Sequence, residues 1–246
     1  MDKRCYVYAI VPSSATLPPD IAGFGSVPRM VAWRDLAAVV SRLEADAIEP
    51  TPENLLRHEA VVEALYAEHA TLPVRFGTVM PDSDAVCQAL RDRYDDLLAD
   101  LRRLGNTVEF SITALWPTGR QASQVQRDEN EADRESRMTA GESSGTAYLR
   151  ARMIEQRHAD MLRNQAEEIA GDITATTRPH TVDHRGNLSP SERIALRDVY
   201  LVPRDHRDAF VAAFDEVRAR HREVRLLLSG PWPPYSFVTP AHEVAQ

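Results

Sequence analysis

The sequence predicts an α+β protein of two units, and three observations support this class. Over residues 1–116, β-rich runs alternate with apolar residues at helical spacing. A charged stretch at 117–145 carries only scattered apolar residues, and a second mixture of helix and strand patterns fills 146–240. A chain of 246 residues is long enough for one large domain or two smaller ones, each with its own core. We expect two domains.

The first unit opens with a strand and a hairpin. The run CYVYAIVP, residues 5–12, is rich in β-branched and aromatic residues and ends at a proline, which predicts a strand. Two short apolar runs follow at 27–33 and 36–41, and only Arg34 and Asp35 separate them. That spacing predicts a tight β-hairpin.

A helix and a further strand follow the hairpin. Thr51 can cap a helix and Pro52 suits its first turn, so the apolar periodicity predicts a helix from about 52 to 70. The run LPVRFGTVM, residues 72–80, predicts a strand. Gly77 inside it predicts a bulge or a close approach of the backbone.

A second helix and a last strand complete the first unit. The helix is expected to start near Asp82, whose carboxylate can cap it, and to end at Gly105. The alternating run at 106–116 predicts the strand. This order of elements over 1–116 predicts helices packed on one face of an antiparallel sheet, and a modified ferredoxin-like sandwich is the natural candidate.

The second unit is predicted to follow a linker. Residues 117–145 cannot bury enough apolar surface to offset the entropy of ordering, so we expect a charged linker or exposed loop. A long helix is predicted at 146–170, and strands at 194–203 and 223–230. A helix between these strands has an apolar inner face of Phe210, Ala213, Phe214 and Val217.

Composition limits the class of partner. The chain has 29 basic and 37 acidic residues and a net charge of −8, which disfavours a general nucleic-acid or anionic-membrane binder. Cys5 and Cys87 are far apart, and no signal-peptide pattern precedes them, so a reducing compartment is expected. The apolar runs are shorter than the roughly 20 residues that cross a bilayer. We expect a soluble, cytoplasmic protein.

Motifs for catalysis, cofactors and metals are not found. The sequence lacks a P-loop, a complete dinucleotide fingerprint, a GxSxG elbow and an HExxH motif. The best candidate for a metal site is His180, Asp183 and His184, because two imidazoles four residues apart could share a helical face. Pro179 and Gly186 instead predict a solvated loop there, so we expect no metal.

Three side chains leave alternatives open. His58 and His69 lie on the apolar stripe of the first helix, either as an acid/base pair or, as we favour, as partly buried histidines bonded to nearby backbone. Arg75 lies among apolar strand residues and needs an anionic or carbonyl partner if it is buried. It could bind a substrate carboxylate, although we favour an internal acid such as Glu59 or Glu63.

The segment GPWPPYSF, residues 230–237, raises a similar choice. Its prolines prevent a helix or a central strand, so it must run extended. Its rings, Trp232, Tyr235 and Phe237, could recognise a partner or fold back and bury themselves. We favour burial, since large rings usually contribute to cores.

Several strings together resemble the GvpL/GvpF family of gas vesicle proteins. They are YVYAIVP near the start, RHEAVVEAL leading into LPVRFGTVM, SGTAYLRAR, VYLVPRDHRDAF and GPWPPYSFV. The resemblance runs from Cys5 to Val238 and is strongest at 72–78 and 230–237. The charged stretch 117–145 and the string VYLVPR depart from the family pattern.

The resemblance implies a fold and a function. Family members have an N-terminal modified ferredoxin-like domain and a C-terminal α+β domain with long helices. They are accessory proteins that help to build gas vesicles in the cytoplasm, contact the shell protein GvpA and other accessory proteins, and are not known as enzymes. The resemblance therefore implies no catalytic residue and no cofactor, and it places the GvpA contact on the N-terminal domain.

The residues singled out above have two interpretations. The resemblance implies that six residues are either a structural signature of the family or a possible contact with a partner: Arg75, Phe76, Gly77, Trp232, Tyr235 and Phe237. The alternative is a ferredoxin-like small-molecule-binding protein or enzyme that uses Arg75 with His58 and His69. The absence of a complete catalytic constellation favours the first reading.

Overall fold

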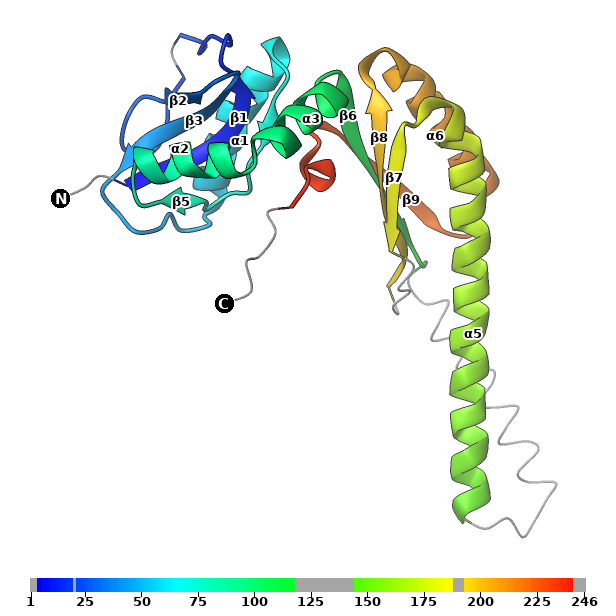
Figure 1. The fold of residues 1–246 in the computed structure, drawn as a ribbon. Coiled ribbons are helices and arrows are strands. Elements are labelled where there is room, and N and C mark those ends of the chain that lie inside the picture. The colour runs from blue at the N-terminus through cyan, green and yellow to red at the C-terminus, as the bar shows by residue number, and fades with distance from the viewer. Residues whose placement is uncertain (1–3, 20, 118–143, 188–192, 241–246) are drawn as a thin grey trace. The chain divides into compact units, whose positions relative to one another are not determined.

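The chain forms two compact α+β units. The computed structural model describes residues 4–19, 21–117, 144–187 and 193–240 (Figure 1). Unit 1 lies within Met1–Glu109 and Pro231–Gln246, and unit 2 within Phe110–Gly230. Each contains an antiparallel sheet with helices packed against it, which confirms the predicted class. The ferredoxin-like detail stays a prediction, and the stretch 117–145 lies outside the described residues except at its ends.

The sheet of unit 1 is built around β1. Its strands are β1 (Arg4–Pro12), β2 (Arg29–Trp33), β3 (Leu36–Leu43), β4 (Leu72–Pro73) and β5 (Val79–Met80). The order is β2-β3-β1-β4, and β5 also pairs with β1. The register of β1 on β3 shifts between Val7 and Ala9. This bulge lets Tyr6, Tyr8 and Val11 join one buried cluster with Ala9.

The predicted hairpin is confirmed. β2 and β3 pair antiparallel, and the pair Trp33 and Leu36 closes the two-residue loop between them. Arg34 in this loop has a φ of 52°, in the left-handed region that few residues other than glycine adopt. The hairpin therefore holds an arginine in a strained backbone conformation at its tip.

Three helices pack on this sheet: α1 (Pro52–Glu68), α2 (Ser83–Asp92) and α3 (Tyr94–Leu104). In Figure 1, α2 lies in front of the sheet and α1 behind it, so the expectation that the helices pack on one face of this sheet is wrong. The predicted caps are confirmed, because the Thr51 hydroxyl accepts the Asn54 N–H and the Asp82 carboxylate accepts the Ala85 N–H. The single helix expected up to Gly105 is wrong, since Arg93, with φ −116° and ψ 20°, separates α2 from α3.

The continuous strand expected at 72–80 is also wrong. The structure has β4 and β5 with a turn between them, and Gly77 in that turn has a φ of 84°. Glycine adopts this angle at little cost, whereas a residue with a Cβ does not. The strand expected at 106–116 is confirmed as β6 (Thr107–Leu115).

Unit 2 has a four-stranded sheet of order β7-β8-β6-β9. Its other strands are β7 (Asp183–Asn187), β8 (Ile194–Pro203) and β9 (Arg225–Trp232), and its helices are α5 (Ser144–Thr177) and α6 (Arg207–Arg220). The Phe210 ring of α6 stacks on Phe110 of β6 and contacts Tyr200 of β8. The loop predicted around His184 is wrong, because those residues form β7 and pair with β8.

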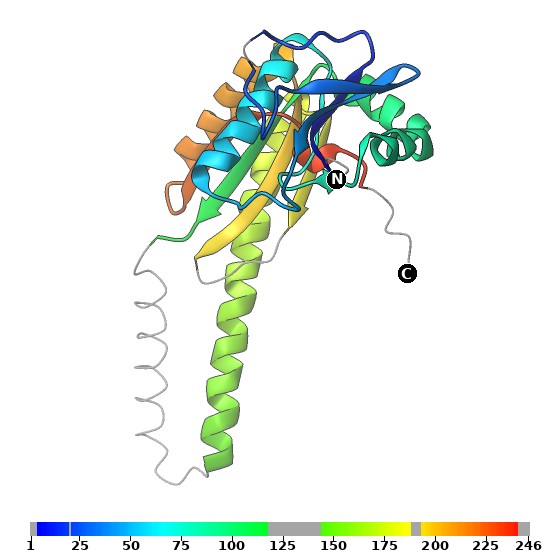
Figure 2. The same cartoon turned by 90° about the vertical axis from the view of Figure 1, so that its left-hand side faces the viewer.

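The helix α5 is longer than the predicted 146–170 and continues past the end of the sheet (Figure 2). Its C-terminal half buries Ala166, Ile169 and Ile173. In its N-terminal half, Tyr148 and Met153 are 64% and 57% exposed. Within the described residues, no helix combines the length and the apolar character that crossing a bilayer requires.

Candidate interaction site

His58 of α1 connects the first strand with the turn between β4 and β5. Its side chain is buried, and its Nδ1 lies 3.0 Å from the Tyr6 hydroxyl of β1. Its Nε2 lies 3.1 Å from the carbonyl oxygen of Val74. The Tyr6 hydroxyl also accepts the N–H of Gly77 at 3.1 Å. Both ends of the 74–78 turn are therefore held by one histidine and one tyrosine.

This network assigns the proton positions. The Val74 carbonyl can only accept, so Nε2 of His58 carries the ring proton; Nδ1 of the neutral ring then accepts the Tyr6 hydrogen, and the Tyr6 oxygen accepts from Gly77. Burial lowers the pKa of His58, although the Val74 hydrogen bond acts in the opposite direction. Burial raises the pKa of Tyr6 to about 12. Both groups are consequently neutral at physiological pH.

The C-terminal segment reaches the same histidine. The Tyr235 hydroxyl donates to Glu59 at 3.0 Å, and its oxygen lies 3.4 Å from Nε2 of His58. Burial raises the pKa of Glu59, the Tyr235 hydrogen bond offsets part of this shift, and nearby Glu63 adds to it. The segments at 72–78 and 230–237, which carry the strongest family resemblance, thus meet on one side chain of α1.

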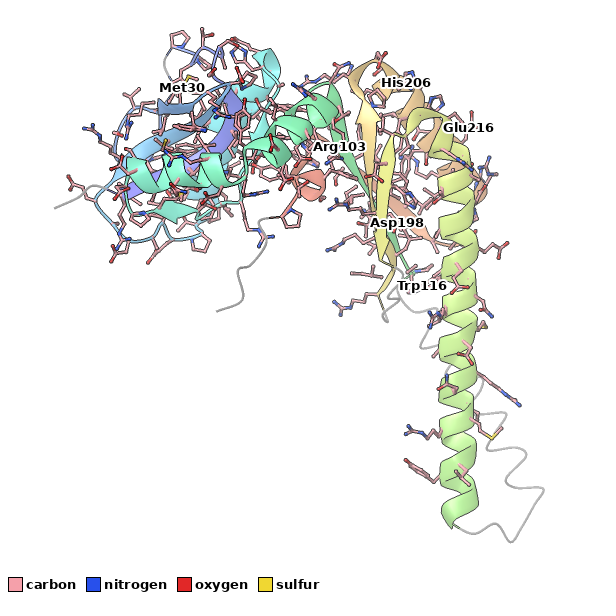
Figure 3. All side chains as sticks on the ribbon, in the orientation of Figure 1. Met30, Arg103, Trp116, Asp198, His206 and Glu216 are labelled. Atoms are coloured by element: carbon pink, nitrogen blue, oxygen red, sulfur yellow. The ribbon has the colours of Figure 1, made fainter. Side chains whose placement is uncertain are left out.

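Further contacts fix residues 233–239, which we call the tail, to unit 1. Glu109 accepts the N–H and the hydroxyl of Ser236, at 2.8 and 2.7 Å. Arg103 of α3 donates to the carbonyl oxygen of Phe237 at 2.7 Å, and Figure 3 shows this arginine beside the tail. The Phe237 ring is fully buried. The tail is therefore an integral part of unit 1.

The signature residues divide into buried and exposed ones. Phe237 is buried, Tyr235 is half-buried, and Phe76 is half-buried against the cluster around Tyr6. Trp232 is 43% exposed, and Arg75 is exposed on the 74–78 turn. The burial favoured for the terminal rings thus holds for Phe237, whereas Trp232 keeps a large exposed face.

The internal ion pair favoured for Arg75 is wrong. Glu63 is exposed, and Glu59 is bonded to Tyr235. Among the described residues, no ion pair of Arg75 is formed. The network around His58 holds the backbone of this turn, and the Arg75 side chain on it is exposed.

The two histidines of the first helix do not form an acid/base pair. Nε2 of His69 accepts the N–H of Thr16 at 3.2 Å, whereas His58 contacts Tyr6 and Val74. Within the described part of the chain, no hydrogen bond or ring contact joins His69 to His58 or to Arg75.

The histidines of unit 2 also have structural contacts. His184 stacks on Tyr200, with ring centroids 5.8 Å apart, and His180 makes an edge contact with His206. The described residues contain no group of three or more side chains placed to hold a metal ion. The three candidate ligands of the 180–184 segment therefore do not converge.

Sequence reasoning missed Tyr6 and Glu109. Tyr6 belongs to a strand that the sequence predicts. The only signal for its role is that Tyr6 and Tyr8 are two residues apart, which places both hydroxyl-bearing rings on the same face of that strand. Glu109 is a carboxylate within the apolar alternation of β6, and such a residue needs a buried partner. Its partner Ser236 lies so far along the chain that local patterns cannot identify it.

Comparisons with known proteins agree on one family. The family model "Gas vesicle synthesis protein GvpL/GvpF" matches residues 4–239. Gas vesicle protein F of Streptomyces sp. (strain CB03234) is 32% identical over 238 residues, which cover 95% of this chain and 98% of that protein. Gas vesicle protein L of the same strain is 32% identical over 264 residues, with coverages of 98% and 95%.

The fold is similar to that of a solved structure. The crystal structure of the gas vesicle protein GvpF from Anabaena sp. PCC7120 superposes with a TM-score of 0.79 at 18% sequence identity. The match covers 98% of this chain and 100% of that one. The similarity therefore extends over both units and is not limited to one of them.

Proposed function

Because this chain belongs to the GvpL/GvpF family of gas vesicle synthesis proteins, we propose that it binds the shell protein GvpA and assists the nucleation or assembly of gas vesicles. The family match over residues 4–239 carries this proposal. In this role the protein is not an enzyme and needs no cofactor. It acts in the cytoplasm, in association with gas vesicles and their other accessory proteins.

The proposed mechanism is capture of new shell subunits. A small amphiphilic subunit with a β-rich apolar surface self-associates without control unless that surface is occupied. An accessory protein that binds this surface keeps the subunit available and delivers it to a growing vesicle. Such a contact needs apolar area for affinity and charged groups for orientation.

We place the GvpA contact on unit 1, at the 74–78 turn. Two observations support this placement: the two strongest signature segments meet at His58, and the turn carries Arg75 without an ion pair among the described residues. A supported turn loses little entropy when it binds. The alternative, a small-molecule site of Arg75, His58 and His69, has less support because His69 contacts Thr16 instead.

Co-purification tests the proposal. Tagged full-length protein is expressed with untagged GvpA, and GvpA expressed alone serves as the reference. We expect GvpA to become soluble and to elute with the tagged protein. The full chain is used because unit 1 requires the tail, which a fragment ending at residue 116 lacks.

Charge reversal tests the placement. Arg75→Glu is expected to reduce the amount of GvpA recovered, whereas Arg102→Glu, at an exposed position of α3, serves as the matched control. Equal recovery with both variants would refute the placement at the turn. Insoluble, unbound GvpA beside the wild-type protein would contradict the proposed function itself.

A further inference from the structure

The outer edge of β2 has unpaired backbone groups. β3 lies on one side of β2, and no strand within the described residues pairs with the other side. Since Trp33 and Leu36 form the hydrogen-bonded pair that closes the hairpin, alternate residues of β2 bond to β3. The N–H and C=O groups of Met30 and Ala32 consequently point away from the sheet; Figure 3 labels Met30 on this strand.

The two faces of the sheet differ along this edge. Alternate side chains of a strand point to opposite faces, so Arg29 and Trp33 lie on the same face as α2. Arg29 donates to Ser83 of α2 at 2.6 Å, and the guanidinium of Arg91 lies 4.4 Å from the centre of the Trp33 ring. Met30 packs on the other face, against the core cluster.

The α2 face of the edge carries arginines without carboxylate partners. The guanidinium of Arg34, at the hairpin tip, lies 5.8 Å from the centre of the Trp33 ring that Arg91 also contacts, and 5.3 Å from that of Tyr94. In the described part of the chain, no ion pair is formed by Arg29, Arg34 or Arg91. These cations contrast with the net charge of −8 of the whole chain.

We propose that the edge of β2 accepts an extended segment of another protein in which carboxylate side chains alternate with apolar ones. The backbone groups of Met30 and Ala32 continue the sheet into that segment. Its carboxylates meet Arg34 and Arg91 on the α2 face, and its apolar side chains extend the surface of Met30. This inference goes beyond the proposed function and does not depend on which protein supplies the segment.

The same arginines disfavour a second copy of this chain as the occupant. Antiparallel pairing of two β2 edges keeps the α2 face of both copies on one side of the joined sheet. Arg34 and Arg91 of one copy are then placed beside Arg29 of the other, and like charges on neighbouring strands repel each other. The edge is thus selective for an acidic strand.

Peptide binding tests the proposal. The full-length protein is titrated with a short synthetic peptide that alternates valine and glutamate, and with its valine and lysine counterpart. We expect the glutamate peptide to bind roughly tenfold more tightly or better, because its carboxylates pair with Arg34 and Arg91, and its affinity to fall as salt is added. Hydrogen exchange of the backbone amides of Met30 and Ala32 is expected to slow when the glutamate peptide binds.

Variants of the edge separate the backbone and charge contributions. Ala32→Pro removes an outward N–H without breaking the hairpin and is expected to weaken binding about fivefold to tenfold, whereas Ala32→Thr keeps that N–H and retains binding. The double variant Arg34→Glu/Arg91→Glu is expected to lose the preference for the glutamate peptide, whereas the control variant Arg102→Glu is expected to keep it. Equal binding of both peptides, no binding of either, or a concentration-dependent dimer lost in Ala32→Pro would each overturn the proposal.

Discussion

Glu109 accepts two hydrogen bonds from Ser236, one from its N–H and one from its hydroxyl. Glu109 is only 7% exposed, so the tail supplies partners that a buried carboxylate requires. Glu109→Ala leaves the Ser236 donors without this acceptor. We expect it to lower the free energy of unfolding by about 2–3 kcal/mol in urea denaturation. Ser236→Ala removes one of the two bonds and should cost about 1 kcal/mol; equal losses in both variants would contradict this assignment.

The terminal rings should differ in their contribution to stability. Phe237 is fully buried and Trp232 is 43% exposed. Phe237→Ala is expected to cost about 3–5 kcal/mol, because it opens a cavity in unit 1. Trp232→Ala should cost less than about 1 kcal/mol. Thermal unfolding of both variants measures the difference, and similar losses would show that Phe237 does not act as a core residue.

Replacement of glycine by alanine should have opposite effects on stability at Gly77 and at Gly171. At both Gly77 and Gly171, a Cβ would meet no atom within 4 Å, so neither substitution causes a clash. Gly77 has a φ of 84°, and Gly77→Ala should therefore destabilise the protein by about 1–2 kcal/mol through backbone strain. Gly171 lies within α5, where Gly171→Ala should stabilise by about 0.5–1 kcal/mol. Denaturation midpoints that shift in the same direction would contradict the prediction.

His58 should make unit 1 sensitive to acid. Burial lowers its pKa in the folded protein, so between that value and the unfolded pKa of about 6.5 the unfolded chain binds more protons. The stability contribution is therefore complete above the unfolded pKa and is lost as pH falls through it. His58→Gln removes the titrating group and should flatten this dependence. If the difference in unfolding free energy between the wild type and His58→Gln stays constant with pH, His58 is not the group responsible for the acid sensitivity.

His221 should have the opposite pH dependence. Its Nε2 and Nδ1 lie 2.8 Å from Asp172 and from Glu223, and only the imidazolium donates to both. Burial opposes its charge, but the two carboxylates outweigh this effect and raise the pKa of His221. Its stabilising contribution is present below the unfolded pKa and is lost as pH rises through the folded one. His221→Gln should therefore destabilise the protein most at low pH, and unfolding measured across pH checks the sign.

Local patterns in the sequence predicted most elements of the fold. The hairpin around Arg34 and Asp35 and the caps at Thr51 and Asp82 depend on short-range chemistry, and the structure confirms them. The break at Arg93 was missed because no proline or glycine marks it. The guanidinium of Arg93 donates to the carbonyl oxygen of Thr239 at 2.5 Å, a contact with the distant tail that helical periodicity does not encode.

The candidate site was predicted only in part. The strings around Arg75 and Tyr235 were marked by family resemblance, but their meeting at His58 depends on tertiary packing. The interior partner expected for Arg75 assumed a continuous strand. The positive φ of Gly77 instead turns the chain there, and Arg75 is exposed.

The discontinuity of unit 1 has a consequence for the order of events during translation. The residues up to Glu109 emerge from the ribosome before any part of unit 2, yet Phe237 completes their core only after Gly230 has been synthesised. A nascent chain therefore contains an incomplete unit 1 while the continuous segment of unit 2 can already fold. Chains that stall before Phe237 should remain substrates for chaperones and proteases even when unit 2 has reached its native state.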